Sequence, residues 1–140
     1  MSLCKGFKKS DGEMISYDTS EVGRINRGMF IQCGRIKVNK TVETGASVFE
    51  SEFADESFAI KHTEIGMLGM CKRGSQKHSN ESQFYITTGS PLSFLDGENV
   101  VFGRVIEGMQ TLCEIECLEC SNEKPNDQVR ISKCGAYIKT

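Results

Sequence analysis

The sequence predicts a mainly β domain of short strands, a barrel or a sandwich, with one helix in its C-terminal half. Short apolar and β-branched runs recur between turn residues, as they do in all-β folds. Glycine occurs 14 times in 140 residues and proline only twice, which suits many tight turns between strands. A length of 140 residues is typical of one domain, so we expect residues 1–140 to form a single domain.

The loops and strands can be given in chain order. Residues 1–20 are polar and broken by glycine and aspartate, and residues 35–48 are mixed and rich in small side chains, so both are predicted to be loops. Residues 72–80 form a basic, polar loop that we expect to be solvated. Apolar, aromatic and β-branched content predicts five strands, at residues 29–32, 66–71, 84–87, 100–105 and 129–134.

One helix is predicted to begin at Gly108. Met109, Leu112 and Cys113 stand at i, i+3 and i+4, the spacing of an apolar helix face, and further apolar residues extend that face. A turn is predicted at residues 124–127, KPND.

The charges of the chain nearly cancel. The 17 basic and 19 acidic side chains give a net charge of −2, which argues against a dedicated DNA- or RNA-binding domain. No apolar run approaches the roughly 20 residues that cross a bilayer, so no membrane contact is predicted. The first residues, MSLCKGFKK, lack the apolar core of a secretory signal. We therefore expect the protein in the cytoplasm, with the nucleus and the cilium as alternatives.

Seven cysteines are spread along the chain. Their odd number and the lack of a secretory signal favour reduced thiols that serve as small apolar side chains. Cys117 and Cys120 have C-x-x-C spacing, but a zinc site needs a second pair or a histidine. His62 and His78 are both distant in sequence. No metal or other cofactor is therefore predicted.

Four segments together form a recognisable pattern. Three of them are NESQFYITT at residues 80–88, FLDG at residues 94–97 and VVFGRVIEGM at residues 100–109. The fourth has Arg24 followed by MFIQCG at residues 29–34. Together they resemble the cyclophilins, the peptidyl-prolyl cis-trans isomerases with a β-barrel fold. The resemblance covers nearly the whole chain and implies an antiparallel barrel capped by two helices.

The resemblance also implies that the barrel is incomplete. Cyclophilins normally begin with two paired strands and a first helix, whereas this chain starts at residues that resemble the end of that helix, LCKG at residues 3–6. We therefore expect an incomplete barrel on the N-terminal side, in which the strand at residues 129–134 lacks a neighbour. Either the chain is a fragment of a longer protein, or it is a shortened relative whose open barrel edge is covered by a protein partner.

The implied chemistry needs no nucleophile, metal or cofactor. Arg24 is implied as the catalytic arginine, and Gln32 as the glutamine that holds it and the substrate carbonyl. A guanidinium that donates to the prolyl nitrogen draws the lone pair out of resonance, which lowers a rotation barrier of about 18–20 kcal/mol. Arginine suits this role because it stays charged and presents a rigid fork. The other implied substrate-binding positions are Met29, Phe30, Cys71, Lys72, Gln83, Tyr85, Phe94, Leu95 and Asn99.

Several positions depart from the family pattern. Val22 and Gly23 precede Arg24 where the family has Phe-His, and Asn99 stands where a histidine is usual. Phe94 replaces a tryptophan that is associated with tight cyclosporin binding, so we expect cyclosporin to bind weakly. Lys72 replaces an asparagine, which leaves its backbone as the implied anchor for a peptide.

More than one function stays open from the sequence. The first is an isomerase that acts on X-Pro bonds in proline-containing peptides or partly folded proteins. The second is a cyclophilin-like module that binds a proline-containing or strand-like segment without turnover, within a larger assembly. An unrelated small β-barrel is a third interpretation, in which Phe30, Tyr85 and Leu95 are simply core residues.

Overall fold

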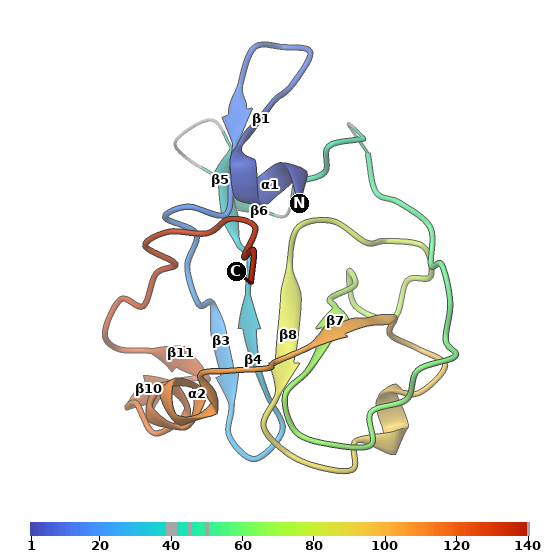
Figure 1. The fold of residues 1–140 in the computed structure, drawn as a ribbon, viewed down its shortest axis with the longest axis vertical. Helices are drawn as coiled ribbons and strands as arrows, with labels where there is room; N and C mark the ends of the chain where they lie inside the picture. The colour runs from blue at the N-terminus through green and yellow to red at the C-terminus, as the bar shows by residue number, and fades with distance from the viewer. Residues whose placement is uncertain (39–41, 45, 50, 140) are drawn as a thin grey trace.

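A five-stranded antiparallel sheet forms the centre of the molecule (Figure 1). The computed structural model describes residues 1–38, 42–44, 46–49 and 51–139. The strands stand in the order β3 (Arg24–Asn26), β4 (Phe30–Cys33), β8 (Phe84–Thr87), β7 (Met67–Met70) and β9 (Val101–Arg104), each antiparallel to its neighbour. Four of the five predicted strands are thereby confirmed.

Alternation along β4 gives the sheet two different faces. Ile31 and Cys33 are buried, whereas Phe30 and Gln32 are only partly buried. Successive side chains of a strand point to opposite sides of the sheet. Ile31 and Cys33 therefore mark an inner face, and Phe30 and Gln32 an outer face.

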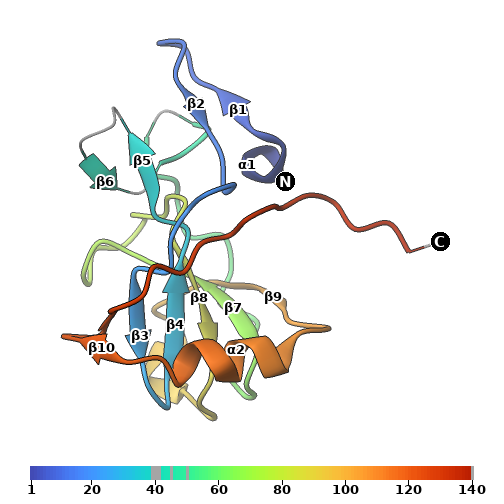
Figure 2. The ribbon, with the colours of Figure 1, turned by 90° about the vertical axis from the view of Figure 1, so that its left-hand side faces the viewer.

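Helix α2 (Met109–Glu116) covers part of the inner face (Figure 2). It begins after Gly108, as predicted, and the φ of 94° at this residue favours glycine. The buried core on this side comprises Val22, Ile25, Ile31, Cys33 and Leu112. The apolar face predicted for the helix is confirmed in part: Leu112 is buried and Met109 and Ile115 pack against the same cluster, whereas Cys113 is exposed.

The turn between β3 and β4 fixes the C-terminal end of α2. The Arg27 side chain donates to the backbone carbonyls of Glu116, at 3.1 Å, and Leu118, at 2.9 Å. The Glu116 carboxylate in turn accepts the N–H of Gly28 at 2.6 Å. The last carbonyls of a helix lack intrahelical partners, so a cation is favourable there. The start of the sheet and the helix are therefore held together.

A smaller layer stands beside one end of the sheet (Figure 1). It consists of α1 (Ser2–Lys5), β1 (Phe7–Lys8), β2 (Met14–Ile15), β5 (Ile36–Val38) and β6 (Val42–Thr44). Its buried core is formed by Ile15, Ile36 and Ala46. The loops predicted for residues 1–20 and 35–48 are thus wrong in part, because strands of two or three residues are too short to produce a readable alternation. Residues 39–41 and 45 of the second loop lie outside the described residues.

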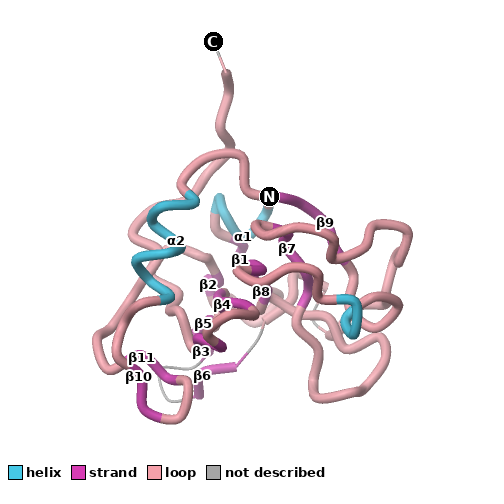
Figure 3. The backbone as a smooth tube through the Cα atoms, turned by 90° about the horizontal axis from the view of Figure 1, so that it is seen from below, coloured by secondary structure: helices cyan, strands magenta, loops and turns pink. Residues whose placement is uncertain are grey.

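The C-terminal part differs from the prediction in two ways. The turn expected at residues 124–127 lies instead at Asn122 and Glu123, between β10 (Cys120–Ser121) and β11 (Lys124–Pro125). The prediction of a strand at residues 129–134 is wrong. The pairing of this segment is reduced to a bridge between Glu21 and Arg130 and a few backbone hydrogen bonds to residues 19–22. Figures 2 and 3 show the residues that follow leaving the body of the molecule.

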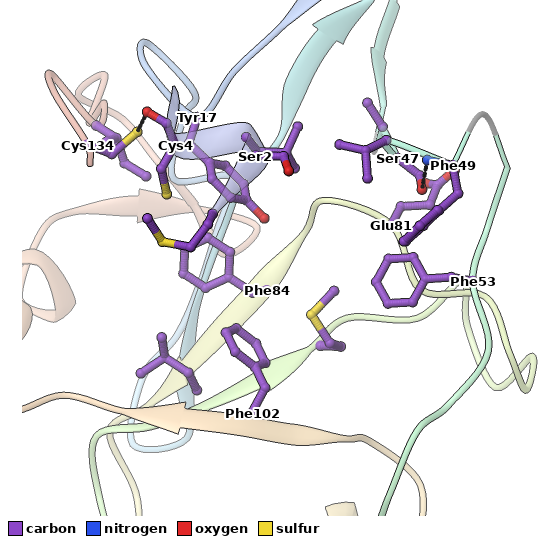
Figure 4. Close-up of a pocket in the computed structure, with 17 residues that line it drawn as sticks. Ser2, Cys4, Tyr17, Ser47, Phe49, Phe53, Glu81, Phe84, Phe102 and Cys134 are labelled. Atoms are coloured by element: carbon purple, nitrogen blue, oxygen red, sulfur yellow. Dashed lines mark hydrogen bonds between the residues drawn. The ribbon is translucent and has the colours of Figure 1, made fainter. Parts of the chain in front are cut away.

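The sheet does not close into a barrel within the described residues. β9 is the last strand of the order and pairs with β7 on one side. Next to it lies an apolar cavity of about 550 Å³, which α1 and the C-terminal segment also border (Figure 4). Its lining from the sheet is Leu68, Met70, Phe84 and Phe102, and Phe102 is 52% exposed. The incomplete barrel expected from the sequence is confirmed.

Candidate functional site

The strand register places three side chains in one row on the outer face. Arg24 of β3 stands opposite Gln32 of β4, which stands opposite Tyr85 of β8. Directly opposed residues of antiparallel strands have Cβ atoms about 5 Å apart and point to the same side. The row ends at Gly69 of β7, the partner of Tyr85. Segments far apart in sequence thus contribute an arginine, an amide and a phenol to one surface.

Arg24 is held by two contacts. Its Nε donates to the carboxylate of Glu123, with which it forms an ion pair. Its guanidinium carbon also lies 5.5 Å from the centre of the Phe30 ring, a cation–π contact. The side chain remains 46% exposed, so a substrate can reach it. Arg24 therefore lies over an aromatic ring at the protein surface.

Gln32 makes a different contact from the one expected. Its amide nitrogen donates to the side-chain oxygen of Gln83 at 2.9 Å, while Arg24 is bound by Glu123. Gln32 and Gln83 form a polar pair in which each side chain fixes the other. Gln32 lies on β4 opposite Tyr85, and Gln83 lies directly before β8. Both side chains remain partly exposed, so the pair can present amide donors and acceptors to a peptide.

The partly exposed Phe30 ring lies beside Arg24 and packs against the buried Tyr85 ring. Their ring centres are 5.5 Å apart at an angle of 49°. The Tyr85 hydroxyl lies 2.6 Å from Nε2 of the buried His62, whose Nδ1 lies 2.8 Å from Asp96 Oδ1. Hydrogen bonds from the backbone and the side chain of His62 hold the pKa of Asp96 below its usual range. Asp96 is thus an ionised acceptor. In the His62 tautomer that donates from Nδ1 to this carboxylate, Nε2 accepts the Tyr85 hydroxyl.

Gly69 is required by this arrangement. A Cβ atom at this position would lie 2.2 Å from the Tyr85 hydroxyl oxygen, far inside van der Waals contact. The phenol therefore occupies space that any other residue would fill. Burial raises the pKa of Tyr85, which keeps the hydroxyl protonated as a donor.

The segment after Pro91 is tied to His62. Phe94 and Leu95 lie on a 3₁₀ turn, η1 (Ser93–Leu95); Phe94 is 59% exposed and Leu95 is half-buried. His62 fixes this turn, because its N–H donates to Asp96 at 2.7 Å and its carbonyl accepts the Leu92 N–H at 3.0 Å. The same histidine thus contacts both Tyr85 and the 3₁₀ turn η1.

Three further predicted positions lie around this centre. Met29 is half-buried, and its carbonyl accepts the N–H groups of Thr88 and Gly89. The Asn99 amide donates to the Met70 carbonyl at 3.0 Å, so its side chain supports β7. The Cys71 N–H donates to the Gln83 carbonyl, and burial raises the pKa of its thiol to about 12.

Lys72 is not part of a solvated loop, which corrects one prediction. Its Nζ lies 2.8 Å from Asp55 Oδ2, both side chains are buried, and Nζ also lies 5.4 Å from the centre of the Phe58 ring. Burial acts to raise the pKa of Asp55, but hydrogen bonds from Lys72, Asn80 and the backbone of His78 hold it below its usual range. The lysine ammonium is thereby committed to an internal ion pair.

The sequence interpretation missed several residues that organise the site. They are the partners of the predicted residues: Asp55, His62, Gly69, Asp96 and Glu123. Asp96 lies within the FLDG segment and could have been singled out there. The others carry no local spacing signal, because each contact joins distant parts of the chain.

The described residues contain neither a metal-ligating group of three or more side chains nor a helix long and apolar enough to cross a membrane. Cys117 is exposed and Cys120 is half-buried, and both are free thiols.

The comparison with protein families assigns the chain clearly. Residues 1–136 match the model described as cyclophilin type peptidyl-prolyl cis-trans isomerase/CLD. The chain therefore belongs to the cyclophilin family, as the four sequence segments predicted.

The similar proteins include one named as an isomerase and one named as a probable inactive isomerase. The chain is 44% identical to peptidyl-prolyl cis-trans isomerase B of Saccharomyces cerevisiae over 94 residues, 66% of this chain and 45% of the relative. It is 38% identical over 139 residues, 96% of the chain, to the NK-tumor recognition protein of Homo sapiens, of which this is 9%. It is also 38% identical over 124 residues to human "Probable inactive peptidyl-prolyl cis-trans isomerase-like 6", 89% of the chain and 39% of the relative. The chain spans less than half the length of each of these relatives.

Proposed function

We propose that this chain is a peptidyl-prolyl cis-trans isomerase that acts on X-Pro bonds in peptides and partly folded proteins. The observation that carries the proposal is the outer-face row, in which the Arg24 guanidinium lies over Phe30 beside Tyr85. Such a surface offers an apolar seat for a proline ring and a fixed cation at its edge. These are the two elements that the reaction needs.

The proposed mechanism is electrostatic. The prolyl ring packs on Phe30, which the buried Tyr85 ring supports, with Met29, Phe94 and Leu95 at the rim of the site. The guanidinium of Arg24 donates to the prolyl nitrogen only when that nitrogen becomes pyramidal, because a planar amide nitrogen has no free lone pair. The twisted state is therefore bound more tightly than the planar one, which is the condition for catalysis.

The remaining residues have supporting roles in this proposal. Gln32 and Gln83 bind the substrate backbone through their paired amides, and Cys71 and Lys72 supply backbone groups along the peptide. Asn99 acts indirectly, because its amide holds the Met70 carbonyl. Seven free thiols support a reducing compartment, and we place the protein in the cytoplasm.

An isomerisation assay tests the proposal. Relaxation of an X-Pro peptide from cis to trans is measured with the wild type, with Arg24→Ala and with Arg104→Ala, which removes an exposed arginine from β9. Loss of one preorganised charged donor costs about 100-fold to 1000-fold in rate. Arg24→Ala should lose the activity and Arg104→Ala should keep it. Equal background rates for all three proteins would leave only a binding role.

Weak binding of cyclosporin stays a prediction. Phe94 has no N–H donor where the family tryptophan has one, and the ring is 59% exposed on η1. Calorimetric titration should give a Kd above about 1 µM. A nanomolar Kd would contradict this.

A second candidate function is favoured by the inner face. Among the described residues β9 has a partner strand on one side only, and an apolar cavity lies beside it. We infer that an apolar β-strand from a protein partner adds to β9 and fills this cavity, because a free strand edge and exposed apolar side chains both favour strand addition. In this role the chain is a binding module, with or without turnover. Affinity purification followed by cross-linking at Phe102 tests it; cross-links confined to a helical or polar segment would refute it.

A further inference from the structure

We propose that Glu123 is the positioning residue for Arg24, a role that rests on the isomerase function proposed above. The pair joins residues 99 positions apart in sequence, and its carboxylate binds Nε rather than the terminal nitrogens of the guanidinium. One of the five N–H donors of the arginine is used in this way, and the four on the terminal nitrogens remain for a substrate. The carboxylate thus fixes the side chain without occupying its outer end.

The backbone carries Glu123 to this position through a two-residue hairpin turn. β10 and β11 pair with Cys120 opposite Pro125 and Ser121 opposite Lys124, so Asn122 and Glu123 form the turn. Their φ angles are 50° and 65°, both left-handed, which is the geometry of a type I′ turn. Asparagine followed by glycine is the preferred pair for this turn. Glutamate at the second position is strained, and nothing about the turn itself calls for it.

The turn is also tied to the strand that carries Arg24. The Glu123 carbonyl accepts the N–H of Ile25 at 2.7 Å, so its backbone is fixed next to the arginine. The hairpin is closed by Ser121, whose hydroxyl donates to the Asn126 side chain at 2.7 Å. A strained residue held in place by backbone contacts, with its carboxylate on the catalytic cation, indicates that the side chain serves the site rather than the turn.

Two contacts of Arg24 act from different directions. The Glu123 carboxylate binds Nε, and the Phe30 ring lies 5.5 Å from the guanidinium carbon. An arginine side chain has many rotamers, and an unrestrained one would rarely lie over the proline seat. Together, the carboxylate and the ring restrict the guanidinium to the pose that the reaction uses. Gln32, the expected holder, is occupied by Gln83.

The proposal predicts opposite effects on stability and on catalysis. Glu123→Gly relieves the left-handed strain at the turn and removes the carboxylate. Its melting temperature should therefore equal or exceed that of the wild type, while its kcat falls about tenfold or more, because small displacements of a catalytic group are costly. KM should change less than about twofold, since the apolar seat is intact. The kcat of Glu123→Gln, which keeps a hydrogen-bond acceptor, should lie between those of the wild type and Glu123→Gly.

The experiment compares wild type, Glu123→Gly, Glu123→Gln and Glu119→Gln, the last a control that removes a neighbouring exposed carboxylate. Each is assayed for kcat and KM on one X-Pro peptide and for thermal unfolding. The control should match the wild type. Parallel losses of kcat and melting temperature in Glu123→Gly would make Glu123 merely structural. A rise in kcat would mean that Glu123 inhibits the enzyme by keeping Arg24 away from the substrate. Either result overturns the proposal.

An NMR measurement separates this inference from the isomerase proposal. If the wild type has no activity that Arg24→Ala abolishes, the proposed function fails. The Arg24 Nε–Hε resonance still reports the pair, and Glu123→Gln should shift it while Glu119→Gln should not. An unmoved resonance would overturn the positioning contact whatever the activity.

Discussion

The two faces of the central sheet differ in how fully their side chains are covered or paired within the chain. On the outer face each polar group of the site has a partner within the chain: Arg24 has Glu123, Gln32 has Gln83, and Tyr85 has His62. On the inner face α2 covers one part, and the other part borders an apolar cavity of about 550 Å³. The comparison teaches that the outer site combines residues of β3, β4, β8 and β7 with partners outside these strands, such as His62 and Glu123. It is assembled although the sheet does not close into a barrel within the described residues.

The sharpest way to break the outer face is Gly69→Ala. The new methyl group would lie 2.2 Å from the Tyr85 hydroxyl and displace the ring that supports Phe30 in the proline seat. Isomerase activity should fall about 100-fold. Gly103→Ala is the matched control, because the nearest atom to its Cβ is Leu68 at 3.9 Å. If the two variants keep equal activity, Tyr85 does not support the proline site.

A second test concerns the segment that connects the two faces. Phe53 lines the cavity, and two residues later Asp55 holds the buried Lys72. Asp55→Asn leaves a buried ammonium without its counter-charge and should cost about 3 kcal/mol at pH 7. Asp127→Asn, at an exposed carboxylate, should cost nothing measurable. Urea unfolding at pH 7 measures both; equal stabilities would mean that the Lys72–Asp55 pair is not buried in solution.

The same pair predicts a direction for the pH dependence. The pKa of Asp55 is lowered in the folded protein, because hydrogen bonds from Lys72 and its neighbours outweigh the effect of burial. Its contribution is therefore fully present above the unfolded pKa of about 4 and is lost as the pH falls through the lower folded value. The stability difference between wild type and Asp55→Asn should shrink in that acid range. A difference that grows on acidification would contradict the assigned sign.

The inner face is tested by a milder change. Phe102→Ser removes an aromatic ring that is 52% exposed beside the cavity. The centre of this ring lies 6.4 Å from that of Phe84, in an edge-on arrangement. The substitution should lower stability by about 1 kcal/mol and reduce binding of a hydrophobic dye, with activity kept within about twofold. A parallel loss of activity would show that the two faces are coupled.

The smallest expected effect is that of salt. The Arg24–Glu123 pair is nearly half exposed on both sides, so added salt screens it. Raising the salt concentration from about 0.05 M to 0.5 M should lower kcat of the wild type less than about threefold. In Glu123→Gly the same change should have no effect, and an equal salt response in both would remove the pair as its cause.

The sequence predicted the strands and helix that are long enough to show a period. Residues 84–87 and the helix start at Gly108 were predicted correctly, because their apolar patterns run for a full element. The short pairs β1–β2 and β5–β6 were missed because two or three residues give no alternation. The segment at residues 129–134 has the alternation of a strand, but within the described residues it pairs only through the bridge between Glu21 and Arg130 and a few backbone hydrogen bonds to residues 19–22.

The site was predictable only where it follows a pattern. Arg24, Phe30 and Tyr85 could be identified by resemblance, and the register brings them together. Glu123 could not, because its contact spans the chain and a hairpin turn gives no reason to expect a carboxylate. Lys72 looked solvated among basic neighbours, since its partner Asp55 lies 17 residues away.

Exchange NMR of an X-Pro peptide tests most directly whether the outer face is a working site. With a catalytic amount of the wild type, cross-peaks between the cis and trans forms should appear on a timescale of seconds or less, whereas the uncatalysed peptide takes tens to hundreds of seconds. Arg24→Ala should restore the uncatalysed spectrum. Cross-peaks of equal intensity with wild type and Arg24→Ala would contradict the role of the guanidinium, and their absence with both would leave this chain a binding module.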